Sequence, residues 1–182
     1  MGWDLTVMET VAEHRVGWVT ALARGLMAIG QPIETYVAAA VVALLFAWRF
    51  RAWGPVVCGM VASIVATGIA GFAKELIGRA RPPAELAVVP ASGLAMPSTI
   101  GALTAGAATP LVLAGLRGML VAGRSVAAVL IAGTVVVGVC MVYLGAHWAS
   151  DVLVGWALGV AVGAVLFQLL LRLSRRPVGS TR

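Results

Sequence analysis

The chain has 182 residues, of which 61% are hydrophobic and 11% are charged, and its formal net charge is +6. This composition excludes an ordinary soluble domain and is typical of an integral membrane protein. Short arginine clusters between apolar runs are explained by orientation in a bilayer, so we expect no nucleic-acid partner despite the positive charge. About six membrane-spanning helices of roughly 20 residues would use most of this length.

Residues 1–15 are predicted to form an amphipathic helix at the membrane interface. An apolar face at helical spacing lies opposite an acidic one: Trp3, Val7, Met8, Val11 and Ala12 against Asp4, Glu9 and Glu13. The segment opens with acidic residues and lacks a continuous apolar run, so we expect no cleaved secretory signal. His14 is expected to be a surface residue.

Six apolar runs follow, at about residues 16–30, 32–48, 53–72, 97–116, 126–144 and 152–171. The first is the weakest, because Arg24 at its centre costs about 2.5–3.5 kcal/mol on insertion scales; the run can tilt, pair Arg24 with an acid, or only enter the membrane partway. We therefore predict an all-α, polytopic membrane helix bundle over residues 16–171, followed by a basic cytoplasmic tail, 172–182. Gly155, Gly159 and Gly163 recur every four residues, which predicts close approach of a neighbouring helix.

The arginines predict the orientation of the bundle. If every run crosses, eight of them share one side: Arg49, Arg51, Arg117, Arg124, Arg172, Arg175, Arg176 and Arg182. That side is expected to be cytoplasmic. Lys74, Arg79 and Arg81 are then the basic residues of the opposite side, where anion binding is the simplest reason for positive charge. The arginine-for-lysine bias is typical of a GC-rich bacterial genome, so we expect a bacterial inner membrane.

The only long polar connection, residues 74–96, carries two cations that can converge. Lys74 and Arg81 are seven residues apart and would share a helix face until Arg81-Pro82-Pro83 extends the backbone. Ion pairing with Glu75 and Glu85 is the alternative to anion binding.

Pro97-Ser98 marks the start of the fourth apolar run. Proline suits the first turn of a helix, where backbone N–H groups lack partners. The N–H groups and hydroxyls of Ser98 and Thr99 can bind phosphate there, although simple helix capping is the commoner use of such a pair.

The stretch "YLGAHWASD" places His147 and Asp151 four residues apart at a membrane boundary. The pair would share one helix face, or Asp151 would cap the helix that follows. Two histidines far apart in sequence, without an acidic cluster, predict neither a metal site nor a cofactor.

Together these segments resemble the type 2 phosphatidic acid phosphatase and haloperoxidase-like membrane phosphatases, whose motifs are K-x6-R-P, P-S-G-H and S-R-x5-H-x3-D. "KELIGRARP" matches the first motif, and "HWASD" keeps the His and Asp of the third. The resemblance implies that His147 attacks phosphorus and forms a phosphohistidine, and that Asp151 orients it. It also implies that Lys74, Arg81, Ser98 and Thr99 hold the phosphate.

Two positions depart from these motifs. The histidine of P-S-G-H, which protonates the leaving group, is Ile100 here, and S-R of the third motif reads Cys140-Met141. Arg79 could supply the absent guanidinium. A phosphate that leaves from a diphosphate needs no such proton, so a surviving activity would favour a diphosphate lipid.

Three functions are compatible with this pattern. The first is hydrolysis of a polyprenyl diphosphate or related lipid phosphate at the extracytoplasmic face. The second is a family member without turnover that binds a lipid phosphate or acts as a partner subunit, in a homo-oligomer or hetero-oligomer. The third is an unrelated membrane protein with fortuitous motifs.

Overall fold

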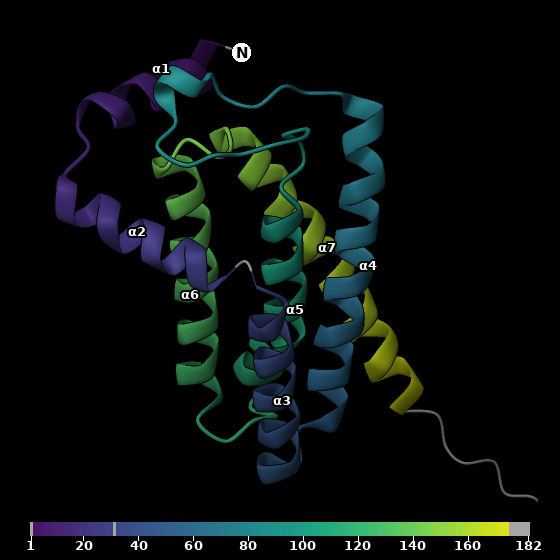
Figure 1. Ribbon diagram of the computed structural model, residues 1–182. Helices are drawn as coiled ribbons and strands as arrows, with labels where there is room; N and C mark the ends of the chain where they lie inside the picture. The colour runs from purple at the N-terminus through teal and green to yellow at the C-terminus, as the bar shows by residue number, and fades with distance from the viewer. Residues whose placement is uncertain (1, 31, 175–182) are drawn as a thin grey trace, which may run out of the picture.

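The computed structural model describes residues 2–30 and 32–174, and within them every element of regular secondary structure is a helix (Figure 1). Seven α-helices and one short 3₁₀ helix follow in order: α1 Gly2–Glu13, α2 Gly17–Ile29, α3 Ile33–Phe50, α4 Trp53–Ile77, η1 Ala84–Leu86, α5 Thr99–Leu116, α6 Gly123–Tyr143 and α7 Ala149–Ser174. The predicted all-α membrane bundle is confirmed. Of the predicted basic tail, residues 175–182 lie outside the described residues.

Five helices of the described chain, α3 to α7, are long and apolar enough to cross a membrane. The expected sixth span is not among them, because α2 has 13 residues and is only about 20 Å long, against a hydrocarbon core of about 30 Å. Figure 1 shows α2 running obliquely beside α6 from the end of the bundle where α1 lies. The helix formed by the first apolar run is therefore too short to cross the hydrocarbon core by itself.

The connection between α1 and α2 is held at the same end as the loop between α4 and α5. Arg15 donates to the carbonyl of Tyr143 at the end of α6 and to the carbonyl of Leu86 in η1. Arg24 donates to the carbonyl of Val88 in the same loop. The expectation that Lys74, Arg79 and Arg81 are the only basic residues there is thus wrong, since the first run does not cross and Arg15 and Arg24 stay at that end.

Helix α1 lies across the top of the bundle in Figure 1, against α6, α7 and η1. Its buried residues are Asp4 and Met8, which are one helical turn apart and share a face. Asp4 was expected on the polar face; it is instead 3% exposed, because that face is the one that docks on the start of α7. His14 is exposed, as expected.

Helix α5 is the centre of the bundle and packs on α4 and α7 at glycine contacts. A Cβ added to Gly159 of α7 would lie 2.4 Å from the backbone oxygen of Ala102 in α5, and one added to Gly155 would lie 2.5 Å from that of Ser98. On the other side, a Cβ at Gly59 of α4 would meet the oxygen of Ala107 at 2.6 Å. The predicted close approach along the glycine stripe is confirmed, and it holds the starts of α5 and α7 together.

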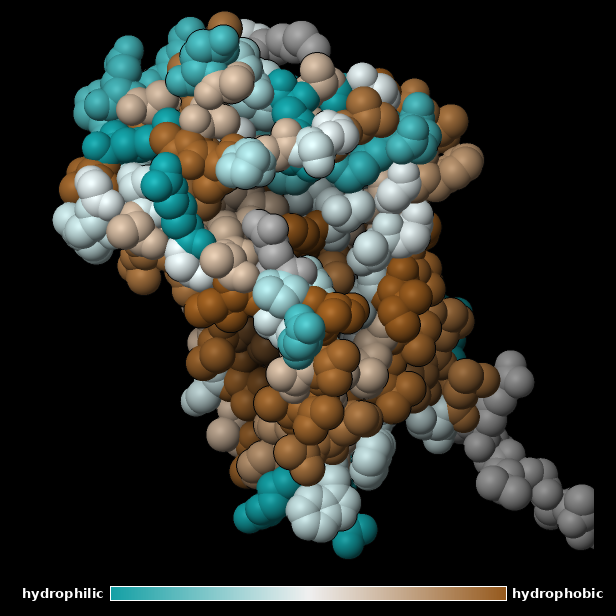
Figure 2. All heavy atoms as spheres, viewed as in Figure 1, coloured by the Kyte–Doolittle hydropathy of each residue, from teal (hydrophilic) through white to brown (hydrophobic). Residues whose placement is uncertain are grey.

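Polar side chains gather at the two ends of the molecule, with an apolar belt between them (Figure 2). Each of the helices α3 to α7 carries exposed large hydrophobic residues, among them Val42, Ile64, Phe72, Val129 and Leu173. The described arginines at the termini of the spans are all at the end opposite α1: Arg49, Arg51, Arg117, Arg124 and Arg172. The chain is thus a multi-pass membrane protein with its polar loop cluster at one end.

Candidate active site

His147 lies in the tight connection between α6 and α7. The N–H groups of Ala146 and His147 both donate to the carbonyl of Met141, at 3.0 and 3.3 Å, so the backbone folds back on the end of α6. Asp151 is the third residue of α7 and accepts a hydrogen bond of 2.9 Å from the N–H of Trp148. This is the acidic half of a capping box, and it fixes Asp151 at the helix start. Capping and the His147–Asp151 pairing are therefore both present.

The long loop passes directly over this connection. Gly145 has φ +76°, and a Cβ there would lie 2.6 Å from the Cα of Ala87. The carbonyl of Leu144 accepts from the N–H of Val88 at 3.0 Å. Glycine at position 145 is therefore required both for the left-handed turn and for the loop contact that covers His147.

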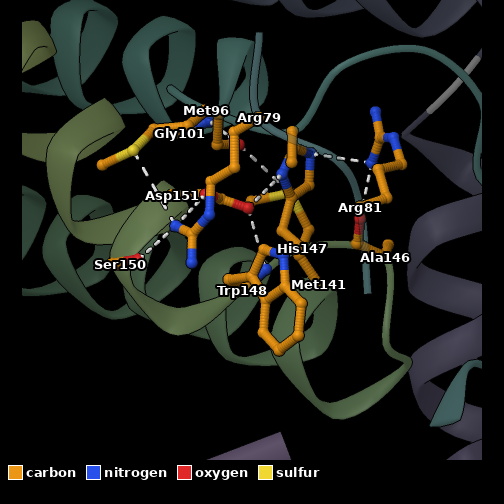
Figure 3. A network of polar contacts seen from close by, with 12 residues as sticks. Arg79, Arg81, Met96, Gly101, Met141, Ala146, His147, Trp148, Ser150 and Asp151 are labelled. Atoms are coloured by element: carbon orange, nitrogen blue, oxygen red, sulfur yellow. Dashed lines mark hydrogen bonds and ion pairs between the residues drawn. The ribbon is translucent and has the colours of Figure 1, made fainter. Parts of the chain in front are cut away.

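Arg81 and Asp151 hold the two nitrogens of the His147 imidazole (Figure 3). Nη1 of Arg81 lies 3.3 Å from Nε2 and also donates to the carbonyl of Ala146, while Nε donates to the carbonyl of Ser92. A guanidinium can only donate, so Nε2 is the acceptor and the proton of the neutral ring is on Nδ1. Nδ1 lies 3.4 Å from Oδ2 of Asp151, and among the described residues it has no partner that meets hydrogen-bond geometry.

The surroundings keep the imidazole neutral. Burial lowers the pKa of His147 below its ordinary value, and the charges of Arg81 and Lys74 lower it further, while Asp151 opposes the shift. The residue is 4% exposed. A neutral histidine with its lone pair on Nε2 is the form that a nucleophile requires.

Lys74 lies in the last turn of α4 and is turned toward the loop that precedes α5. Its ammonium group donates to the carbonyls of Leu94 and Ala95 at 2.8 and 3.2 Å. The N–H of Ala95 donates in turn to the carbonyl of Arg79. Lys74 thus fixes the loop, and its charge also acts on the imidazole of His147. Among the described residues, Lys74 forms no ion pair with Glu75 or Glu85.

Ser98 is the N-cap of α5 and is fully buried. Its hydroxyl accepts from the N–H of Gly101 at 3.2 Å and lies 3.6 Å from the sulfur of Met141. Its own N–H donates to the carbonyl of Asp151 at 2.9 Å. Thr99 is the first residue of the helix and is half-buried. The start of α5 therefore contacts the start of α7. The Ser98 hydroxyl already caps α5 through the N–H of Gly101.

Arg79 is the centre of a buried ion cluster on the other side of the imidazole from Arg81 (Figure 3). Nη1 contacts Oδ1 of Asp151 at 2.7 Å, and Nη2 contacts Oδ2 of Asp4 at 2.6 Å. Ser150 donates to Asp4 through its N–H and its hydroxyl, at 3.0 and 2.6 Å. The Arg79 guanidinium also lies 5.4 Å from the Trp148 ring. As a phosphate ligand Arg79 stays a prediction, because both its terminal nitrogens already contact carboxylates.

A cavity of 390 Å³ lies beside His147. It is lined by Met27, Tyr36, Arg81, Val89, Pro90, Ala91, Ser92, Ile100, Met141, Ala146 and His147. Ile100 and Met141, the two positions that depart from the motifs, thus both form its wall. A second cavity of 520 Å³ adjoins it along the loop and also includes Arg81.

The structure brings His147, Asp151 and Arg81 into contact, and it places Lys74, Ser98 and Thr99 around them at one end of the bundle. Sequence reasoning missed Asp4, which contacts the cluster from the N-terminal helix. The available signal was its position one helical turn before Met8, with which it shares a helix face. Among residues 2–30 and 32–174, no three His, Cys, Asp or Glu side chains gather as they would around a metal ion.

Comparisons with known proteins agree with this arrangement. The transmembrane PAP2-type phosphatidylglycerolphosphate phosphatase from Bacillus subtilis superposes with a TM-score of 0.70 at 22% identity, over 100% of this chain and 88% of that one. LpxE from Aquifex aeolicus superposes with a TM-score of 0.66 at 18% identity, over 90% and 94% of the two chains. No curated protein sequence matches significantly. The model of the PAP2 superfamily matches residues 55–175, from the start of α4 to the end of α7, and the chain belongs to this superfamily.

Proposed function

We propose that the protein is a lipid phosphatase that hydrolyses a polyprenyl diphosphate or a related lipid phosphate at the extracytoplasmic face of a bacterial inner membrane. The observation that carries the proposal is the neutral His147 between Arg81 and Asp151, at the mouth of a cavity. The membership in a superfamily of membrane phosphatases supports the same reaction class.

The reaction would proceed in two displacements. Nε2 of His147 attacks the terminal phosphorus, an N–P bond forms, and the bond to the leaving oxygen breaks, which releases the lipid monophosphate. Water then attacks the phosphohistidine, the N–P bond breaks, and inorganic phosphate leaves. Asp151 faces the positive charge that develops on the ring, and Arg81 and Lys74 face the negative charge that develops on the phosphoryl oxygens.

The lining of the cavity favours a diphosphate lipid as the substrate. Ile100 cannot protonate a leaving group, and loss of a general acid typically costs about 10²–10⁴ in rate for a leaving group that needs a proton. A lipid monophosphate leaves without one. Met27, Val89 and Met141 form an apolar part of the wall, which suits the first part of a lipid chain.

Binding without turnover is the second candidate function. It is favoured by Ile100 and Met141, which replace a proton donor and a cation of the family motifs in the wall of the cavity. Arg81 and Lys74 would then hold a lipid phosphate that His147 does not cleave, and the protein would act as a binder or partner subunit.

Phosphate release by the purified protein tests both candidates. We expect release from lipid diphosphates, slower release from lipid monophosphates, and loss of both in His147→Gln, which keeps the size of the side chain. Equal release by the two proteins would exclude hydrolysis by His147. Should neither release phosphate while the wild type binds lipid phosphate and Arg81→Glu does not, the binding function is the one supported.

A further inference from the structure

The two aspartates of the chain, Asp4 and Asp151, both contact Arg79. They are 3% and 0% exposed. The cluster joins the N-terminal helix to the residue that faces the proposed nucleophile, and the function described above assigns Asp4 no role. Buried carboxylates beside a single cation are costly, so the arrangement calls for a reason.

The two terminal nitrogens of Arg79 contact different aspartates, and this explains why both carboxylates are buried beside one cation. A guanidinium beside one carboxylate normally binds both of its oxygens in a two-pronged pair. Here Nη2 is taken by Asp4 and only Nη1 reaches Asp151, at Oδ1. Oδ2 of Asp151 therefore remains for the N–H of Trp148 and for Nδ1 of His147.

The net charge of the cluster is consistent with Arg79 contacting both aspartates. Asp4, Arg79 and Asp151 together carry one net negative charge, whereas Arg79 and Asp151 alone would carry none. Burial by itself raises the pKa of Asp4, but hydrogen bonds from Ser150 and Arg79 outweigh burial and lower the pKa below its ordinary value. Asp4 is thus ionised at neutral pH.

We propose that Asp4 is a positioning residue, which holds one arm of Arg79 and so keeps Oδ2 of Asp151 free to orient the imidazole of His147. Without Asp4, Arg79 binds both oxygens of Asp151, neutralises it, and withdraws it from the ring. This inference rests on the proposed function only where it speaks of turnover; the effect on the imidazole is independent of turnover.

The charged and titratable groups that face His147 determine in which direction its pKa should shift when Asp4 is replaced. They are Lys74 on α4, Arg81 in the loop after α4, and Asp151 on α7, with the Tyr36 phenol of α3 across the cavity. Asp151 is the one acid that stabilises the imidazolium. If Asp4→Asn lets Arg79 neutralise Asp151, the pKa of His147 falls, by about 0.5–1 unit.

The chain contains two histidines, so the imidazole of His147 can be titrated directly by NMR of ¹⁵N-histidine-labelled protein in nanodiscs, with His14→Gln to assign the signals. Asp4→Asn keeps the shape of the side chain. Glu9→Gln removes the same charge from an exposed position of the same helix. The double variant Asp4→Asn/Arg79→Gln restores the net negative charge of the cluster.

We expect the pKa of His147 to fall in Asp4→Asn, to stay unchanged in Glu9→Gln, and to return to the wild-type value or above it in the double variant. Equal values in Asp4→Asn and Glu9→Gln overturn the proposal, as does a double variant that stays as low as Asp4→Asn. If Asp4→Asn does not fold, the double variant against the wild type decides by the same criterion. Phosphate release, measured in parallel, tests the proposed function separately: its absence leaves the titration intact.

Discussion

At the scale of single residues, the site combines an imidazole held on both sides with a cavity wall in which Ile100 stands where the family motif has a histidine. Nε2 and Nδ1 of His147 face Arg81 and Asp151, at 3.3 and 3.4 Å. Ile100 sits in the first turn of α5 and faces the same cavity as the imidazole. If the protein has the proposed function, we expect the side chain at position 100 to decide which leaving groups the site can release.

Ile100→His is expected to raise hydrolysis of a lipid monophosphate by about 10², because it places a proton donor where the leaving oxygen would lie. Hydrolysis of a diphosphate should change much less, since its leaving group needs no proton. Rates of phosphate release from the two substrates measure this. Ile100→Gln is the matched control, because it has similar polarity and cannot donate a proton; equal rates for the two variants would contradict the role of position 100.

At the scale of the helices, the glycine contacts of α5 place Ser98 against Asp151. Gly155 and Gly159 let α7 approach the backbone of α5 closely enough for the N–H of Ser98 to reach the carbonyl of Asp151 at 2.9 Å. The geometry of the site therefore depends on the packing of α5 against α7 at Gly155 and Gly159. A single methyl group in this contact would separate the two helix starts.

Gly159→Ala is expected to lower the free energy of unfolding by about 1–3 kcal/mol, because the new Cβ meets backbone atoms that cannot move aside singly. Gly133→Ala on α6 is the control, since a Cβ there has nothing within 4 Å, and alanine favours a helix over glycine by about 1 kcal/mol. Unfolding in detergent with increasing SDS measures both. A Gly159→Ala protein as stable as Gly133→Ala would show that the contact tolerates separation.

At the scale of the whole molecule, the five candidate spans of the described chain predict that α1 and the described end of α7 lie on opposite sides of the membrane. Helix α1 shares the site end with the loop after α4, while the described end of α7 carries Arg172 at the arginine-rich end. An odd number of crossings requires this separation. Six crossings, as the apolar runs alone suggest, would put α1 and the site on different sides, and Asp4 could not reach Arg79.

Labelling with a membrane-impermeant maleimide tests the orientation, because Cys58 and Cys140 are buried. Cysteines at Glu9 and Glu85, both exposed at the site end, are expected to react in intact cells. A cysteine at Val121, which is 71% exposed in the loop between α5 and α6, is expected to react only after lysis. Protection of Glu9→Cys together with reaction of Glu85→Cys would restore the six-span topology.

The sequence by itself determined the properties that depend on local pattern. Hydropathy and length predict the helical membrane bundle, and the spacing of Lys74, Arg81, His147 and Asp151 predicts the family. The orientation inferred from arginine placement stays a prediction. The glycine spacing predicts the packing of α7. Each of these properties can be predicted from the sequence because the residues that cause it lie close together in the chain, within a few turns of one helix.

The tertiary structure alone decided where α1 and α2 lie and which partners Asp4 and Arg79 take. Asp4 and Ser150 are separated by 146 positions, and no periodicity in either segment encodes their contact. A 13-residue apolar run has the composition of a span without its length, so only the contacts of Arg15 and Arg24 with loop carbonyls show that it stays at one end. Charges that meet through folding are therefore the part of this site that local sequence cannot predict.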